Sequence, residues 1–146
     1  MRITRKGRYA VRILVDIALN RGRPVSRRDL SVRQRIPPDY LAQILQPLRA
    51  AGFVVGVKGP GGGYALARDA TQIRIGDVLR AAEGAIALSD CTTGGAIVTC
   101  HLAETCRSRL FWEGLSQVIS DYANDWTIAD LCQNPPSAAK TKEQEG

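Results

Sequence analysis

The sequence predicts a mainly α-helical fold with one small β-hairpin, arranged as a winged helix–turn–helix head followed by a long C-terminal helix. Three observations support this prediction. Apolar residues recur at helical spacing around two short segments that begin at Ser26 and Pro37. Two short apolar runs flank a glycine-rich stretch. A narrow apolar stripe runs along the chain after residue 107. The predicted organisation is therefore a head, a cysteine-bearing loop, a dimerisation-helix region and a disordered tail, over residues 1–84, 85–106, 107–132 and 133–146.

The head is expected to begin with a helix of about four turns that Gly22 ends. Its apolar residues are spaced by three and four: Tyr9, Val11, Ile13, Leu14, Ile17 and Ala18. A second, short helix is expected to run from the capping residue Ser26 to about Arg35, because an acidic residue follows Ser26 by three positions. Pro37-Pro38 then opens a third helix over Asp39–Ala51, since proline fits the first turn of a helix. These helices together predict a helix–turn–helix.

The pattern then changes to that of a β-hairpin. Phe53–Val57 and Tyr64–Ala67 are expected as strands, joined by the turn Gly59–Gly63. A hairpin directly after a helix–turn–helix is a wing. A short helix is expected over Ile73–Ala82, and the segment from 85 to 106 is expected as a loop with at most one helical turn.

The apolar stripe after Arg107 predicts a helix of about 18 residues whose narrow seam suits pairing with a second copy of the chain. The stripe steps by four, three, four and four residues: Phe111, Leu115, Val118, Tyr122 and Trp126. Thr127 and Asp130 form a second capping pattern, which starts a short helix through Cys132. The polar residues beyond it are expected to be disordered.

The net charge of +6 is distributed unevenly along the chain. Residues 1–68 hold fourteen Lys and Arg against three acidic residues, whereas residues 69–146 hold six against eleven. Clustered basic charge in the first half favours a polyanionic partner, above all double-stranded DNA, over the alternative of a solvated charged face. No run is long and apolar enough to span a bilayer, and Arg12 and Asp16 interrupt the first apolar stretch, so a cytoplasmic protein without membrane contact is expected.

The third helix is the candidate recognition helix. Glutamine can form paired hydrogen bonds with adenine, tyrosine can bind a phosphate, and alanine can pack on a thymine methyl. The residues expected in the major groove are Asp39, Tyr40, Ala42, Gln43 and Gln46. Those expected at phosphates, or at the wing, are Arg27, Arg28, Arg49, Lys58 and Gly61. The alternatives are glutamines that are only solvated and a glycine run that is only a flexible turn; the run lacks the pattern of a nucleotide-binding loop.

Cys91, Cys100 and Cys106 follow a C-x8-C-x5-C pattern in the loop before the long helix. Loosely spaced thiols on a loop suit an iron–sulfur cluster better than zinc, which usually shows tight cysteine pairs. A thiol redox switch, a zinc site and purely structural cysteines are the alternatives. A fourth ligand could come from the partner subunit, from a small exogenous ligand, or from His101, Asp90 or Glu104. Cys132 is most simply a small buried apolar residue.

Several stretches of the chain closely resemble the IscR family of winged-helix regulators: MRITRKGRYAVRILVDIALN, DYLAQIL, VKGPGGGYALARDATQIRIGDVLRAAEG and the three-cysteine loop. The resemblance covers roughly residues 1–132. It implies a homodimer joined by the long helices, operator DNA as the partner, and a cluster whose presence or oxidation state changes DNA binding. By position, the resemblance makes the three loop cysteines the cluster ligands. It also makes Tyr40, Gln43 and Arg49 DNA contacts and places Lys58 at the wing.

The chain departs from the family pattern at three positions. Arg109 stands where the family has a histidine ligand, and Ala42 stands where the recognition helix carries an acidic residue. Arg8 stands where the nitric-oxide-sensing relatives have an acidic ligand. A 2Fe–2S cluster is favoured, with 4Fe–4S as the alternative.

The predicted function is that of a homodimeric, sequence-specific transcriptional regulator controlled by this cluster and acting at promoters with RNA polymerase. The rivals are a cluster-free regulator that senses oxidants through thiols and an iron–sulfur carrier or redox protein. The last lacks a Cys-x-x-Cys pair and leaves the basic head unexplained. An enzyme is not expected.

Overall fold

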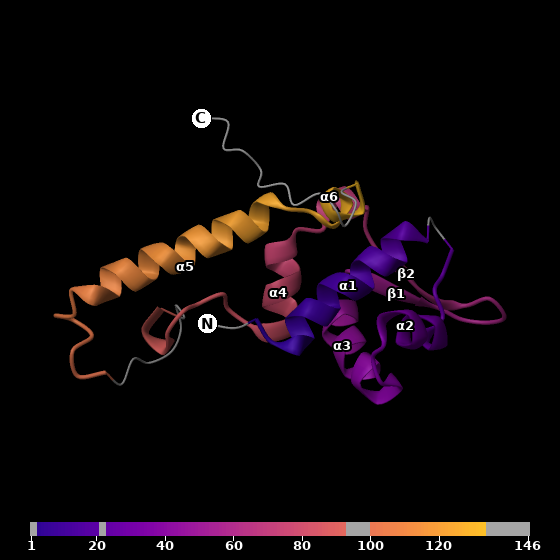
Figure 1. Ribbon diagram of the computed structural model, residues 1–146, viewed down its shortest axis with the longest axis horizontal. Coiled ribbons are helices and arrows are strands. Elements are labelled where there is room, and N and C mark those ends of the chain that lie inside the picture. The colour runs from indigo at the N-terminus through magenta and orange to yellow at the C-terminus, as the bar shows by residue number, and fades with distance from the viewer. Residues whose placement is uncertain (1–2, 21–22, 93–99, 134–146) are drawn as a thin grey trace.

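The computed structural model describes residues 3–20, 23–92 and 100–133. Within these ranges the chain forms six α-helices, one antiparallel β-hairpin and two short 3-10 helices, which confirms the predicted fold class (Figure 1). None of the described helices is long and apolar enough to cross a membrane. In chain order the elements are α1 Arg5–Leu19, α2 Arg27–Gln34, α3 Pro38–Ala50, β1 Val54–Val57, β2 Gly63–Leu66, η1 Ala70–Gln72, α4 Ile75–Glu83, η2 Asp90–Thr92, α5 Ser108–Asp125 and α6 Ile128–Gln133.

The helix–turn–helix is built from α2 and α3. The Ser26 hydroxyl caps α2 by accepting a hydrogen bond from the Asp29 N–H at 3.0 Å, as the sequence predicts. Arg35 ends the helix in the left-handed conformation, with a φ of 53°. Pro38 occupies the first position of α3. The inner face of α3 is then buried in the core through Leu41, Ile44, Leu45 and Leu48.

Helix α1 begins at Arg5, and two contacts satisfy its first N–H groups. The Thr4 hydroxyl accepts a hydrogen bond from the Lys6 N–H at 3.2 Å. The carboxylate of Glu83, at the end of α4, accepts hydrogen bonds from the Gly7 N–H at 2.9 Å and from the Thr4 hydroxyl at 2.7 Å. A Cβ at position 7 would lie 2.2 Å from a Glu83 carboxylate oxygen, so the glycine leaves the room that this cap needs.

The hairpin lies beside α3 and forms the wing. Its strands pair in the register Val54 with Leu66 through Val57 with Gly63. The turn reverses through Gly59 and Gly61, both with positive φ, which suits glycine. Outside the two strands, Val25 and Tyr64 form a β-bridge with two backbone hydrogen bonds of 2.8 Å. This bridge attaches the base of the wing to the start of α2.

Helix α6 packs against α1 and belongs to the core of the head. Ile128 is fully buried in the same cluster as the α1 and α3 side chains. A β-bridge between Arg74 and Thr127 joins the two ends of the α4–α5 unit. The predicted capping pattern is present: the Thr127 hydroxyl accepts from the Asp130 N–H at 3.2 Å, and the Asp130 carboxylate accepts from the Thr127 N–H at 2.9 Å. The sequence grouped this helix with the dimerisation region, whereas the structure packs it on the head.

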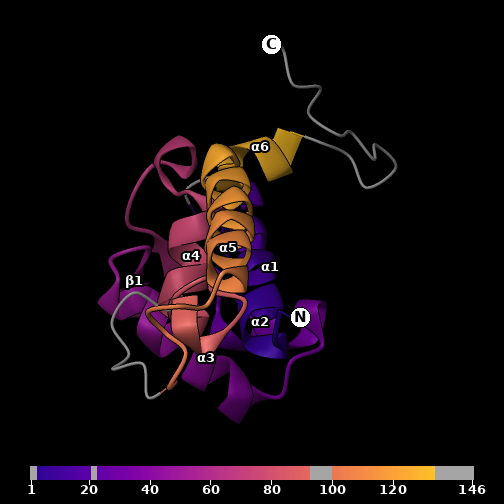
Figure 2. The same ribbon diagram turned by 90° about the vertical axis from the view of Figure 1, so that its left-hand side faces the viewer.

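Helix α5 projects from the head, with η2 beneath it (Figures 1 and 2). The Arg80 guanidinium anchors its C-terminal end by donating to the Asn124 side chain at 2.7 Å and to the Ser120 hydroxyl at 3.3 Å. Most of the predicted apolar seam is exposed to solvent: the exposed fraction is 62% for Phe111 and 64% for Val118. The expected stop at Gly22 and the expected disordered tail beyond Gln133 lie outside the described residues.

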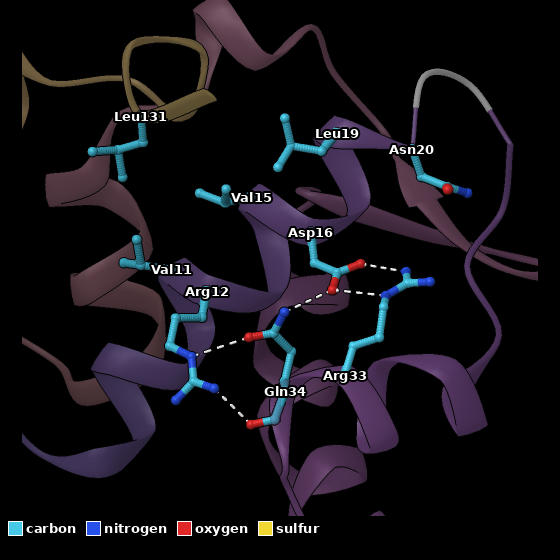
Figure 3. Close-up of a pocket in the computed structure, with 9 residues that line it drawn as sticks. All are labelled: Val11, Arg12, Val15, Asp16, Leu19, Asn20, Arg33, Gln34 and Leu131. Atoms are coloured by element: carbon cyan, nitrogen blue, oxygen red, sulfur yellow. Dashed lines mark hydrogen bonds and ion pairs between the residues drawn. The ribbon is translucent and has the colours of Figure 1, made fainter. Parts of the chain in front are cut away.

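A polar network joins α1 to α2 beside an open hollow lined by both helices and by Leu131 of α6 (Figure 3). The Asp16 carboxylate accepts hydrogen bonds from the Arg33 guanidinium and from the Gln34 side-chain amide. The Arg12 guanidinium donates to the side chain and the carbonyl of Gln34 at 3.0 and 2.6 Å. The Asp16 side chain is 7% exposed, and these partners compensate its burial. The network therefore sets the position of α2 relative to α1.

Candidate nucleic-acid interface and cysteine segment

The outer face of α3 carries three of the predicted base-reading side chains. Asp39, Gln43 and Gln46 are exposed and follow one another at spacings of four and three, so they share one face of the helix. Ala42 lies at the edge of this face and is half-buried. The opposite face is buried in the core, so packing of the head forces these polar side chains outward.

Tyr40, the remaining residue expected in the groove, is half-buried. Its ring meets the Tyr9 ring edge to face, with centroids 6.0 Å apart. The Arg12 guanidinium lies 5.1 Å from the centroid of the Tyr9 ring. The Tyr40 ring therefore contributes to the contact between α1 and α3. Its hydroxyl is the part of the side chain that remains for a contact with DNA.

The predicted phosphate-binding residues surround this helix. Arg27 and Arg28 are exposed at the start of α2, and Lys58 and Gly61 are exposed in the wing. Arg49 lies at the other end of α3, beside strand β1. The structure thus places Arg49 on α3 and the other basic side chains on α2 and the wing, which flank it, and their roles at DNA stay predictions.

The sequence did not single out Tyr64, which lines an open hollow between α2, α3 and the wing. We call this feature the junction hollow; its polar lining comprises Arg27, Gln46, Arg49 and Tyr64. The hairpin pattern of the sequence identified Tyr64 only as the first residue of the return strand, and the structure places it opposite Gly56. Recognising the hollow itself required the contact between the wing and α2.

The cysteines of the loop are free thiols with different surroundings. Cys91 lies in η2, half-buried, with its sulfur 3.0 Å from the Ser89 hydroxyl. The Cys106 sulfur lies 3.2 Å from the Ser108 hydroxyl at the start of α5. This hydrogen bond, followed by one from the Arg109 backbone N–H, lowers the pKa of the Cys106 thiol below its usual value. Cys100 is exposed.

The three loop cysteines are not gathered into one site in the described part of the chain, where no three His, Cys, Asp or Glu side chains cluster as metal ligands would. Residues 93–99, which connect Cys91 to Cys100, lie outside the described ranges. Cys132 packs against the core from α6, and burial raises the pKa of its thiol. That placement agrees with the small apolar role expected for it.

The predicted sources of a fourth ligand have different positions. His101 and Glu104 are exposed in the turn between Cys100 and Cys106. The side chain of Asp90 lies outside the described part of the structure. Arg109, at the position of the family's histidine, donates to Glu113 at 2.6 Å and to the Ala103 carbonyl at 3.3 Å. A guanidinium has no lone pair to offer a metal at neutral pH, so this side chain braces the turn against α5 instead.

A helix–turn–helix with a hairpin beside its second helix defines the winged-helix class of transcriptional regulators. The chain belongs to the Rrf2 family, described as "Iron-dependent Transcriptional regulator", which matches residues 3–134. This confirms the resemblance to IscR-type regulators and the prediction that the chain is a regulator rather than an enzyme.

Relatives and solved structures agree with this assignment. The chain is 39% identical to the HTH-type transcriptional regulator IscR of Cronobacter sakazakii over 135 residues, covering 92% of this chain and 82% of that protein. It is 38% identical to the regulator of the same name from Escherichia coli K12, with the same coverage. IscR of T. potens has a TM-score of 0.74 and 28% identity, covering 97% of this chain and 94% of that one. CymR, the global cysteine regulator of B. subtilis, has a TM-score of 0.73 and 28% identity over 90% and 96% of the two chains.

Proposed function

We propose that the protein is a cytoplasmic homodimer that binds operator DNA sequence-specifically and changes its DNA affinity with the state of an iron–sulfur cluster held by Cys91, Cys100 and Cys106. The observation that carries this proposal is the exposed polar face of α3 beside a hairpin, in a chain whose family is described as iron-dependent regulators. The basic charge of the first half of the chain supports the same conclusion.

The exposed face of α3 offers the chemistry that base recognition needs. Gln43 and Gln46 can each form a pair of hydrogen bonds with adenine, and Asp39 can accept one from cytosine. Arg28 and Lys58, on the flanking elements, would contact phosphates and so orient the helix in the groove. A two-fold dimer would place its two recognition helices in successive major grooves, about 34 Å apart. RNA polymerase stays the predicted partner at the promoter.

The exposed apolar seam of α5 supports the homodimer. Phe111, Leu115, Val118 and Tyr122 share one side of the helix, which differs from the side that carries the buried Ser116 and Ala123. Apolar residues at this spacing on an exposed helix suit pairing with the same helix of a second copy. In such a dimer each α5 would join two heads.

The donor chemistry of the loop fits an iron–sulfur cluster. Cys91, Cys100 and Cys106 would provide three thiolate ligands, and the hydroxyls of Ser89 and Ser108 lie at hydrogen-bonding distance from two of the sulfurs. The cluster would supply a centre that responds to iron supply or to oxidants. Binding it would bring the three cysteines together and so order the 91–106 loop against α5 and the adjacent head. A coupling of about 1.4 kcal/mol between this ordering and DNA binding would change DNA affinity tenfold.

The test is an absorption spectrum with iron and sulfide assays on protein purified without oxygen. We expect charge-transfer bands, sulfide equal to iron, and tenfold or larger differences in DNA affinity between protein with and without the cluster. Cys100→Ala should abolish the bands and leave a folded dimer, because Cys100 is exposed; Cys132→Ala is the matched control and should keep them. Iron-free protein that resists reconstitution yet binds DNA would contradict cluster control and favour the thiol-sensing alternative.

A further inference from the structure

The junction hollow, an open depression of about 540 Å³, lies where α2, α3 and the wing meet. Each element contributes to its lining. Arg27 comes from the first position of α2, Gln46 and Arg49 come from the outer side of α3, and Tyr64 comes from β2. A hollow at this place lies between the helix expected to read bases and the wing.

The backbone holds the Tyr64 side of the hollow in place. Tyr64 and Val25 exchange two backbone hydrogen bonds of 2.8 Å, and Val25 is two residues before Arg27. The approach is so close that a Cβ on Gly63 would lie 2.2 Å from the Val25 carbonyl oxygen. Gly63 also has a φ of 150°, which favours glycine. The last glycine of the glycine-rich stretch is therefore what lets β2 contact the start of α2.

The Arg49 side of the hollow depends on a second glycine. Gly56 is the cross-strand partner of Tyr64, so side chains at these two positions would share one face of the hairpin. The Arg49 guanidinium lies over Gly56, 3.8 Å from the point where a Cβ would be, so a methyl group fits there and a larger side chain does not. Arg49 is thus held against the wing, next to Tyr64.

Within the described part of the chain, no ion pair neutralises the charge of the hollow. Among the ion pairs between described residues, neither Arg27 nor Arg49 takes part, whereas Arg33, Arg80 and Arg109 do. Guanidinium groups match the oxygen geometry of a phosphate with their fork of N–H donors, and a tyrosine hydroxyl can donate one more hydrogen bond. The lining therefore suits a singly charged phosphate ester.

We infer that the junction hollow binds one backbone phosphodiester of duplex DNA between the recognition helix and the wing, with Arg27, Arg49 and the Tyr64 hydroxyl as its donors. This inference rests on the proposed function, because it specifies how the DNA backbone is held. The contact is independent of base sequence, so it positions α3 in the groove and adds affinity to every site. Tyr64 becomes a DNA contact, and Gly56 and Gly63 become the residues that make the seat available.

The test measures binding of the full-length protein to two duplexes by fluorescence anisotropy over a series of salt concentrations. One duplex has mixed sequence, and the other is selected from a random pool with the wild-type protein. Arg27→Gln and Arg49→Gln should each weaken binding to both duplexes equally and reduce the slope of log affinity against log salt by about 1. Tyr64→Phe should weaken binding about fivefold with the slope unchanged, because it removes a hydrogen bond and no charge.

Two control variants test whether the effects depend on the place of the charge and on the size of the side chain. Arg23→Gln removes the same charge from an exposed position outside the hollow and should leave the slope nearly unchanged. Gly56→Ala adds a methyl group at ordinary contact distance from Arg49 and should bind like the wild type. Gly56→Leu should displace the Arg49 guanidinium and so reduce the slope of log affinity against log salt by about 1, as Arg49→Gln does. Circular dichroism checks that this variant is folded.

The inference is overturned if the Arg27 and Arg49 variants behave like Arg23→Gln, or if they weaken binding to the selected duplex alone. Tight binding of inorganic phosphate to the hollow, with DNA binding unaffected by the variants, would assign the site to a free anion instead. A wild-type protein that binds neither duplex would overturn the proposed function itself, which is a different result from a wild type that binds and variants that do not differ.

Discussion

The head and α5 differ in what their apolar side chains contact. In the head, Ile13, Leu14 and Ile44 are fully buried in one core that α6 completes. On α5, Phe111 and Val118 are more than 60% exposed. Because buried apolar surface stabilises a fold by about 25 cal/mol per Å², the head gains most of its stability from its own contacts. The apolar stripe of α5 has little contact with the rest of the described chain, and in the proposed dimer a second copy would cover it.

Polar contacts repeat this difference. In the head, the Asp16 carboxylate is 7% exposed and accepts hydrogen bonds from two side chains of α2. On α5, the ion pair between Arg109 and Glu113 joins side chains that are 36% and 42% exposed. The two pairs differ in the carboxylate and not in the arginine, because Arg33 is 46% exposed. The buried Asp16 carboxylate should therefore contribute more to stability than the exposed Glu113 carboxylate.

The largest expected effect is on the core of the head. Ile44→Ala removes buried methyl groups from the inner face of α3 and should lower the free energy of unfolding by about 2–5 kcal/mol. Urea denaturation followed by circular dichroism, at fixed protomer concentration, measures this loss. Val32→Ala, on the exposed side of α2, is the control and should cost less than about 0.5 kcal/mol. Equal losses for the two variants would contradict a self-contained head.

The next effect is on the seam of α5. Val118→Asp places a charge on the exposed apolar stripe and should convert the dimer to a folded monomer, which sedimentation velocity detects. Affinity for a two-site operator should fall about a hundredfold, because the second head is no longer linked to the first. Gln117→Asp adds the same charge beside the stripe and should leave the dimer intact. If Val118→Asp stays dimeric, α5 is not the pairing helix.

The two ion pairs allow a matched comparison. Asp16→Asn replaces the buried carboxylate by a neutral amide, which removes the charge and one of two acceptor oxygens, and should cost about 1–3 kcal/mol of unfolding free energy. Glu113→Gln makes the same change at an exposed carboxylate and should cost less than about 0.5 kcal/mol. Urea denaturation in low salt and in high salt measures both. A loss at Glu113 as large as that at Asp16 would show that α5 is buried in the assembly.

The smallest effects come from the same substitution at two helical glycines. Gly7→Ala places a Cβ against the Glu83 carboxylate and should cost about 1 kcal/mol by displacing the cap of α1. Gly114→Ala on α5 meets open space and should gain about 0.5 kcal/mol, because alanine favours the helix. Thermal unfolding resolves the opposite signs. A destabilising Gly114→Ala would indicate that a partner approaches α5 at this glycine.

Local patterns predicted most of the elements to within a few residues. The cap at Ser26, the proline at the start of α3 and the capping pair Thr127 and Asp130 all act within one turn of a helix, so sequence spacing is enough to recognise them. The contact that caps α1 could not be recognised in the same way, because Glu83, more than seventy residues away, supplies it. The candidate site divides in the same way: α3 was recognised from its pattern, whereas Tyr64 was not.

The helices, the hairpin, the polar face of α3 and the apolar stripe of α5 follow from the sequence alone, because each depends on periodicity and on turn residues close together in the chain. The packing of α6 on the head and the contact of Tyr64 with the start of α2 are visible only in the folded structure. The same is true of Arg49, which lies over Gly56. These contacts join residues far apart along the chain, and they form only where the packed core brings the separate elements together.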